Sequence, residues 1–189
     1  ERATLSGPAR GLAFQLTEAL GTVARGPALE TAGRLSRGDR GALRGCGVRI
    51  GAATLYLPAL LKPTAVRLRA ILWAAWTGEA ARIPPAPGLT TVKAAADTPE
   101  SFYDAVGYPV VAGRAVRADI LERIDGALRQ AARKGDPVPS QQIMSLAGLN
   151  AEDAAALIAA MKRRTPRRAK AKPAREGNAF AKLRELGLT

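Results

Sequence analysis

The residues best suited to chemistry in this sequence are its arginines and lysines. The chain of 189 residues has 29 Lys and Arg against 16 Asp and Glu, a net charge of +13. Much of the excess falls in Lys162–Arg175, KRRTPRRAKAKPAR, which holds eight basic residues and no acidic one. Such a tract attracts a phosphate backbone by releasing its counterions, so binding weakens steeply with salt. The predicted nucleic-acid contacts in this tract are Lys162, Arg163, Arg164, Arg167, Arg168, Lys170, Lys172 and Arg175.

The tract has two prolines and almost no large apolar side chain, so it cannot bury a core. We expect a flexible strap, and the alternative to nucleic-acid contact is a solvated linker that aids solubility.

Residues 1–161 keep a charge of +5, and some of their bases lie close in sequence to aromatic residues. Aromatic faces can stack on unpaired bases while Arg and Lys follow the backbone of a single strand. The alternative is that the aromatics form core, which is the favoured interpretation for Trp73 and Trp76, and that the cations only solubilise the surface. The predicted contacts in this part of the chain are Arg49, Lys62, Arg67, Arg69, Arg114 and Arg117.

Several kinds of active site are excluded by composition. The chain has no His and one Cys, so it has no Ser-His-Asp or Cys-His system, no internal disulfide and no His or multi-Cys zinc site. Neither GxxxxGK[ST] nor a GxGxxG loop after a strand is present. Glu122 and Asp125 are interpreted as a solvated helix face, and Cys46 as an inert thiol. No catalytic residue, cofactor site or metal site is predicted in this chain.

Residues Ile143–Ile158, IMSLAGLNAEDAAALI, have the spacing of a helix-turn-helix, with Arg117–Lys134 as a supporting helix. A reading helix presents hydrogen-bond donors to the major groove near its N-terminus. Here that turn carries Glu152 and Asp153, which repel phosphate. We therefore expect a structural three-helix module and not a sequence-reading head.

Hydrophobic periodicity in the first half of the chain predicts the elements that hold these bases. An amphipathic helix is predicted over residues 5–21, with a stripe that runs on to Val23, and a weaker helix over Ala28–Leu43. Two short strands or a bent hairpin follow at Val48–Ile50 and Thr54–Leu57. The helix Thr64–Trp76 has a broad apolar face of Ala65, Leu68, Ile71, Leu72, Ala75 and Trp76, with Val66 and Trp73 on the far side. We expect this helix to be covered on both faces.

The second half begins with a Pro-rich loop at Arg82–Thr91. A short helix is then predicted at Pro99–Val106, a strand at Tyr108–Val111, and helices at Arg117–Lys134, Ser140–Ala147 and Ala151–Arg164. The last prediction is a short apolar helix at Ala179–Leu188, whose Phe180, Leu183 and Leu186 can dock on the body.

The fold class predicted is mainly α with a few short β-strands, including a small hairpin and a three-helix, helix-turn-helix-like unit. The expected organisation is a helical segment with a hairpin (1–81), a Pro-rich connector (82–98), a helical module (99–161), a basic flexible strap (162–177) and a short docking helix (178–189).

Four segments together resemble one family: residues 5–21, 47–78, 101–124 and 178–186, with YLPALLKP at 56–63 as the most specific block. The family is the C-terminal region of the alphaproteobacterial relatives of the mitochondrial degradosome RNA helicase, which are DExH-type enzymes of helicase superfamily 2. The resemblance covers most of the chain, in the expected order.

The resemblance implies that an ATP-dependent motor precedes this region, and ATP and Mg²⁺ are expected only for that motor. None of the four segments is a catalytic motif, so no catalytic residue is carried over and enzyme activity of this chain stays uncertain. Family members place accessory helical elements after the motor to help hold the strand. By analogy, this region binds a single strand, RNA in preference to DNA, and supports the motor.

Two alternatives remain. One is a stand-alone RNA- or DNA-binding protein, such as a ribosome- or nucleoid-associated factor. The other is a protein-interaction module whose terminal helix recruits a nuclease or another degradation partner. The sequence has no charged-then-apolar leader and no apolar run long enough to span a bilayer, so we expect a cytoplasmic protein without a membrane partner. It begins with Glu rather than Met, which suggests a fragment.

Overall fold

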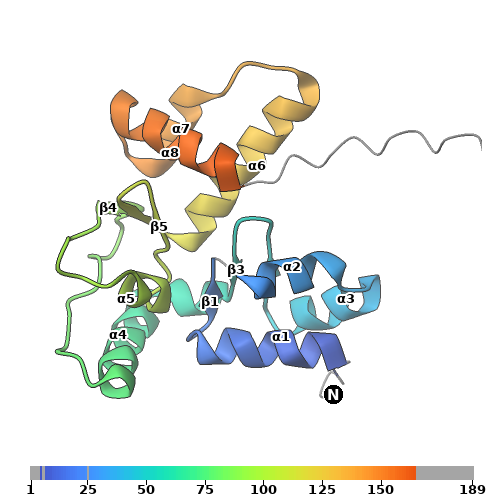
Figure 1. Cartoon of the computed structure of the whole chain (residues 1–189), viewed down its shortest axis with the longest axis vertical. Coiled ribbons are helices and arrows are strands. Elements are labelled where there is room, and N and C mark those ends of the chain that lie inside the picture. The colour runs from blue at the N-terminus through green and yellow to red at the C-terminus, as the bar shows by residue number, and fades with distance from the viewer. Residues whose placement is uncertain (1–4, 6, 25, 165–189) are drawn as a thin grey trace, which may run out of the picture.

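Eight α-helices and two small antiparallel sheets make up the part of the chain that the computed structural model describes, residues 5, 7–24 and 26–164. The fold is mainly helical with short strands, which confirms the predicted class. Figure 1 shows the N-terminal helices on one side, a central helix pair on the other, and the last three helices together at one end. The predicted docking helix at 178–189, and the strap beyond residue 164, lie outside the described residues.

The N-terminal helix is shorter than its apolar stripe predicts. α1 (Gly7–Glu18) ends before Leu20, which has a φ of 51° and is followed by Gly21 with a φ of 89°. This turn leads into β1 (Thr22–Val23), a strand that the sequence did not predict. The helical prediction for Val23 is wrong because pairing with residues 55 and 56 sets its conformation.

The predicted helix Ala28–Leu43 is in fact two helices, α2 (Pro27–Arg34) and α3 (Arg37–Gly45). The break falls at Ser36, whose hydroxyl accepts a hydrogen bond from the Asp39 N–H at 3.1 Å. Ser is a favoured N-cap because it satisfies an N–H of the first helical turn.

The predicted hairpin is confirmed. β2 (Arg49–Ile50) and β3 (Leu55–Tyr56) pair antiparallel, with Arg49 opposite Tyr56. β1 pairs with the other edge of β3, so the order of the sheet is β1-β3-β2. The sheet and the first three helices share one core, which includes Leu12, Leu16, Leu43, Val48 and Leu55.

A short 3-10 helix, η1 (Pro58–Leu61), leads into α4 (Pro63–Thr77), whose orientation differs from the prediction. The face predicted as far side is buried, and the broad apolar face is open, with Trp76 85% and Ile71 62% exposed. The prediction that both faces are covered is wrong for the described residues. Apolar residues lie nearly all round this helix, so periodicity could not choose its core side. Packing of Trp73 on Phe102, with ring centroids 5.2 Å apart, fixes it.

A second sheet, in the order β4-β6-β5, joins the central helices to the C-terminal end. It consists of β4 (Thr91–Lys93), β5 (Val110–Val111) and β6 (Arg114–Val116), and α5 (Glu100–Ala105) precedes the β5–β6 hairpin. β4 lies inside the predicted connector. One core cluster joins α4 to α5, β5 and β6, so packing extends across that connector.

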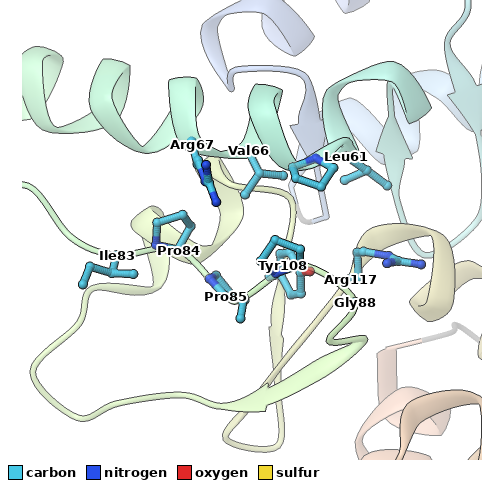
Figure 2. A pocket seen from close by; sticks show the side chains of 12 residues that line it. Leu61, Val66, Arg67, Ile83, Pro84, Pro85, Gly88, Tyr108 and Arg117 are labelled. Carbon is cyan, nitrogen blue, oxygen red and sulfur yellow. The ribbon is translucent and has the colours of Figure 1, made fainter.

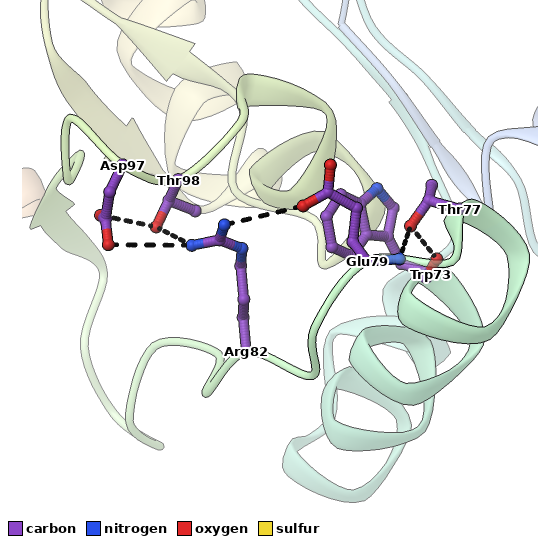
Figure 3. Close-up of polar contacts among 6 residues, drawn as sticks. All are labelled: Trp73, Thr77, Glu79, Arg82, Asp97 and Thr98. Atoms are coloured by element: carbon purple, nitrogen blue, oxygen red, sulfur yellow. Dashed lines mark hydrogen bonds and ion pairs between the residues drawn. The ribbon is translucent and has the colours of Figure 1, made fainter.

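The connector begins at a guanidinium that links two segments (Figure 3). Arg82 lies 3.7 Å from Glu79 and 3.9 Å from Asp97, and donates a hydrogen bond to the Thr98 hydroxyl at 3.1 Å. These contacts hold the chain after α4 against the loop after β4.

The last three helices match their predicted bounds within one residue. They are α6 (Ala118–Lys134), α7 (Ser140–Ala147) and α8 (Ala151–Arg164). Their shared core includes Ile124, Ile143 and Leu157. Asn150 caps α8 by accepting from the Asp153 N–H at 2.8 Å. No single described helix is long and apolar enough to cross a membrane; Ser140–Ala147 and Ala151–Arg163 meet that test of length and composition only together, as a pair bent by 103°.

Candidate nucleic-acid interface

Three of the six contacts predicted outside the basic tract are exposed cations. Arg49 lies on β2, Lys62 immediately precedes α4, and Arg67 lies on the second turn of α4. Within the described part of the chain, none of the three side chains makes an ion pair or hydrogen bond. Their charges are therefore available to a phosphate.

Arg69 is different, because its side chain is buried at 3% exposure. Its guanidinium donates to the Thr22 hydroxyl at 2.7 Å and to the Leu60 carbonyl at 3.2 Å. No carboxylate of the described residues forms an ion pair with it, and burial lowers its pKa to about 10. Arg69 joins α4 to β1 and η1, so it is not part of the surface that a strand could reach.

Arg114 and Arg117 are exposed in part, but each is paired with a carboxylate. Arg114 forms an ion pair with Asp153, at the start of α8, and this contact lowers the pKa of Asp153. Arg117 donates twice to Asp119, from Nε at 2.7 Å and from Nη2 at 2.9 Å. A phosphate would have to compete with these carboxylates, so both arginines are poorer contacts than Arg49, Lys62 and Arg67.

The basic tract begins on α8. Lys162 and Arg163 are exposed in its last turn, so the tract starts from a fixed point on the surface. The side chains of Arg164, Arg167, Arg168, Lys170, Lys172 and Arg175 lie outside the described residues.

A pocket of about 310 Å³ lies beside Arg67 (Figure 2). Arg67 extends from α4 toward Pro84 and Pro85, and Arg117 lies at the other end, beyond Tyr108. The other described residues of the lining are mostly apolar, and none of them carries a carboxylate. The pocket is at the small end of the range for ligand sites, large enough for one planar ring beside a cation.

The wall of this pocket is held by Tyr108. Its ring is 4% exposed, and its hydroxyl donates to the Leu89 carbonyl at 2.8 Å, which fixes the end of the Pro-rich segment. Burial also raises the pKa of Tyr108. The ring is therefore a structural support and cannot stack on a base at the surface.

The two tryptophans differ in exposure: one lies in the core and the other on the surface. Trp73 is core, in an edge contact with Phe102. Trp76 is 85% exposed on the open face of α4, where the core interpretation is wrong. Tyr56, on β3 opposite Arg49, is partly buried.

The carboxylates interpreted as a solvated face are not solvated. Asp125 is 2% exposed and forms an ion pair with Arg129 at 2.6 Å. Glu122 accepts hydrogen bonds from the Ala53 N–H at 2.7 Å and from the N–H and hydroxyl of Thr54. Burial raises the pKa of Glu122. That interpretation is wrong because Glu122 reaches a hairpin loop 68 residues away, which no local pattern reveals.

No family model, curated protein or solved structure matches this chain.

The described residues hold no group of three His, Cys, Asp or Glu side chains that could bind a metal ion, and Cys46 is exposed. The residues that sequence reasoning missed are Glu122 and Arg82, which connect segments distant in the sequence. Neither carries a local signal, because each acts through partners brought close by the fold.

Proposed function

We propose that this chain binds single-stranded nucleic acid, RNA in preference to DNA, as the accessory C-terminal region of an ATP-dependent helicase. The observation that carries the proposal is the acid-free run of eight basic residues from Lys162 to Arg175, which starts at two exposed cations on α8. Such a run binds a phosphate backbone without reading its sequence.

The exposed cations of the body support the same function. Arg49, Lys62 and Arg67 offer charge without a carboxylate partner among the residues described, and Arg67 borders an apolar pocket. A strand held by the tract could place a phosphate on Lys62 or Arg67 and a base against the prolines. Shallow apolar surface beside cations suits a strand whose bases are unpaired.

The helicase context rests on the resemblance of four sequence segments. The motor, with its ATP and Mg²⁺, would belong to an upstream part of the protein in the cytoplasm. Within such an enzyme, the chain would keep the displaced strand near the motor and would carry out no chemical step itself.

The proposal is tested by anisotropy of a labelled single-stranded RNA across a salt series. Neutralising Lys62 and Arg67 together, by substitution with Ala, should lower the slope of log K against log salt by about 1.4, since each contact on a single strand contributes about 0.7. The control is Arg133→Ala with Lys134→Ala, which removes the same charge from the far end of α6. Equal losses in both variants would contradict a role for the α4 edge.

A further inference from the structure

A second hollow differs from the pocket beside Arg67 in the charge of the residues that line it. It lies between the end of α1, the open face of α4 and α5, with a volume of about 530 Å³. Leu20, Leu72 and Trp76 give it apolar walls, and Glu18 and Asp104 give it two carboxylates. Among the residues that the structure describes, its lining includes no Lys or Arg, although the chain as a whole is basic.

The apolar surface continues beyond the hollow. Leu68, Ile71, Leu72 and Trp76 of α4 are between 44% and 85% exposed, and Phe14 of α1 is 65% exposed. Phe14 is one helical turn before Thr17 and Glu18, which line the hollow. Large exposed apolar side chains around a hollow are typical of an interaction site.

We propose that residues 178–188 of the same chain, NAFAKLRELGL, occupy this hollow as an amphipathic helix. In helical form, Phe180, Leu183 and Leu186 share one face. Lys182 and Arg184 fall on either side of that stripe. An apolar stripe flanked by bases is complementary in character and charge to a hollow lined by apolar residues and by the carboxylates of Glu18 and Asp104.

The length of the intervening chain allows this contact. Thirteen residues, 165–177, separate α8 from this segment, and a chain of that length spans up to about 45 Å when extended. A compact domain of this size has a radius of gyration of about 15 Å, so a chain of this length can reach across much of the body from the end of α8. Tethering also supplies an effective concentration in the millimolar range, so a weak contact is enough.

Docking would bring the basic tract back along the body between α8 and α4. The tract would then be anchored at both ends, and its bases would form a line over the surface. This arrangement does not depend on nucleic-acid binding and can be tested without it.

Trp76 reports the contact directly. We expect acrylamide to reach little of the tryptophan emission of the full chain, because Trp73 is buried and docking covers Trp76. Leu183→Asp should raise the accessible fraction to about one half, since one of the two tryptophans becomes exposed. Ala181→Asp is the matched control: it adds the same charge on the opposite side of the helix and should leave the quenching unchanged.

Charge reversal in the hollow tests the same contact from the body of the protein. Glu18→Arg should raise the quenching of Trp76, and Arg184→Glu in the same chain should restore the protection. The proposal is overturned if the wild type and Leu183→Asp are quenched equally. It is also overturned if protection is lost on dilution together with a change in sedimentation, since the occupant is then a second copy, or if it appears only when another protein is added.

Discussion

Replacing Arg69 with Met separates a structural guanidinium from one that binds phosphate. In the folded protein, burial lowers the pKa of Arg69 from its ordinary value to about 10. At about 1.36 kcal/mol per pKa unit, holding the charge inside costs the fold about 3 kcal/mol at neutral pH. Met removes that cost, but it leaves the Thr22 hydroxyl and the Leu60 carbonyl without their donor, at about 1–3 kcal/mol each. The two effects partly cancel, so the free energy of unfolding at pH 7 should change by no more than about 3 kcal/mol.

The pH dependence of the unfolding free energy tests the buried charge of Arg69 more directly than the stability at pH 7 does. The folded-state pKa lies below the unfolded one, so the cost of the charge persists at neutral pH and is relieved as pH rises through about 10. From pH 9 to pH 11.5, the wild type should therefore gain about 2 kcal/mol of unfolding free energy relative to Arg69→Met. Urea denaturation of both proteins at each pH measures the difference, and groups that titrate in both cancel.

The matched control is Arg67→Met, two residues away on the same helix but exposed. It should change stability by less than about 0.5 kcal/mol at every pH and should weaken RNA binding. Arg69→Met should leave RNA binding unchanged. A flat stability difference across pH for Arg69→Met, or a loss of RNA binding without a loss of stability, would refute the structural role.

Three further substitutions test contacts between distant segments. Gly107→Ala should lower the free energy of unfolding, measured by urea denaturation, by about 2–4 kcal/mol, because a Cβ there would lie 2.5 Å from Leu61 at a φ of 86°. The control Gly113→Ala, at a φ of 72° with open space around it, should lower it by about 1 kcal/mol. Equal losses in the two variants would argue against the close approach at Gly107. Burial raises the pKa of Glu122, so the wild type loses stability as this carboxyl ionises in the folded protein. Gln does not ionise, so Glu122→Gln should gain stability relative to the wild type as pH rises from 4 to 7. Asp153→Asn should show the reverse, since a lowered pKa makes the wild-type contribution present near neutral pH and lost on acidification; parallel pH profiles for the two variants would contradict both assignments.

The sequence predicted those elements whose signals are local. α6, α7 and α8 match because each has an apolar stripe with helical spacing, and Gly135 and Gly148 end the first two with positive φ. β1 and β6 were missed because strands of two or three residues exist only through their pairing partners. The core side of α4 was missed because the helix is apolar on most of its surface.

Only part of the candidate interface could be predicted from the sequence. Charge counting located the basic tract without any structure. It could not show that Thr22 and Leu60 bury Arg69, or that Asp153, 39 residues along the chain, pairs with Arg114. Three of the six predicted cations outside the tract therefore remain as open contacts, and the other three have partners that only the fold supplies.

The most direct measurement is the salt dependence of single-stranded RNA binding by the full chain with all eight bases of Lys162–Arg175 changed to Gln. If all eight bases contact the strand in the wild type, we predict that the magnitude of the slope of log K against log salt is smaller by about 5.6 in this variant, at about 0.7 per contact. A control with the five arginines of the tract changed to Lys keeps the charge and should keep the slope. An unchanged slope in the Gln variant would contradict strand binding by the tract.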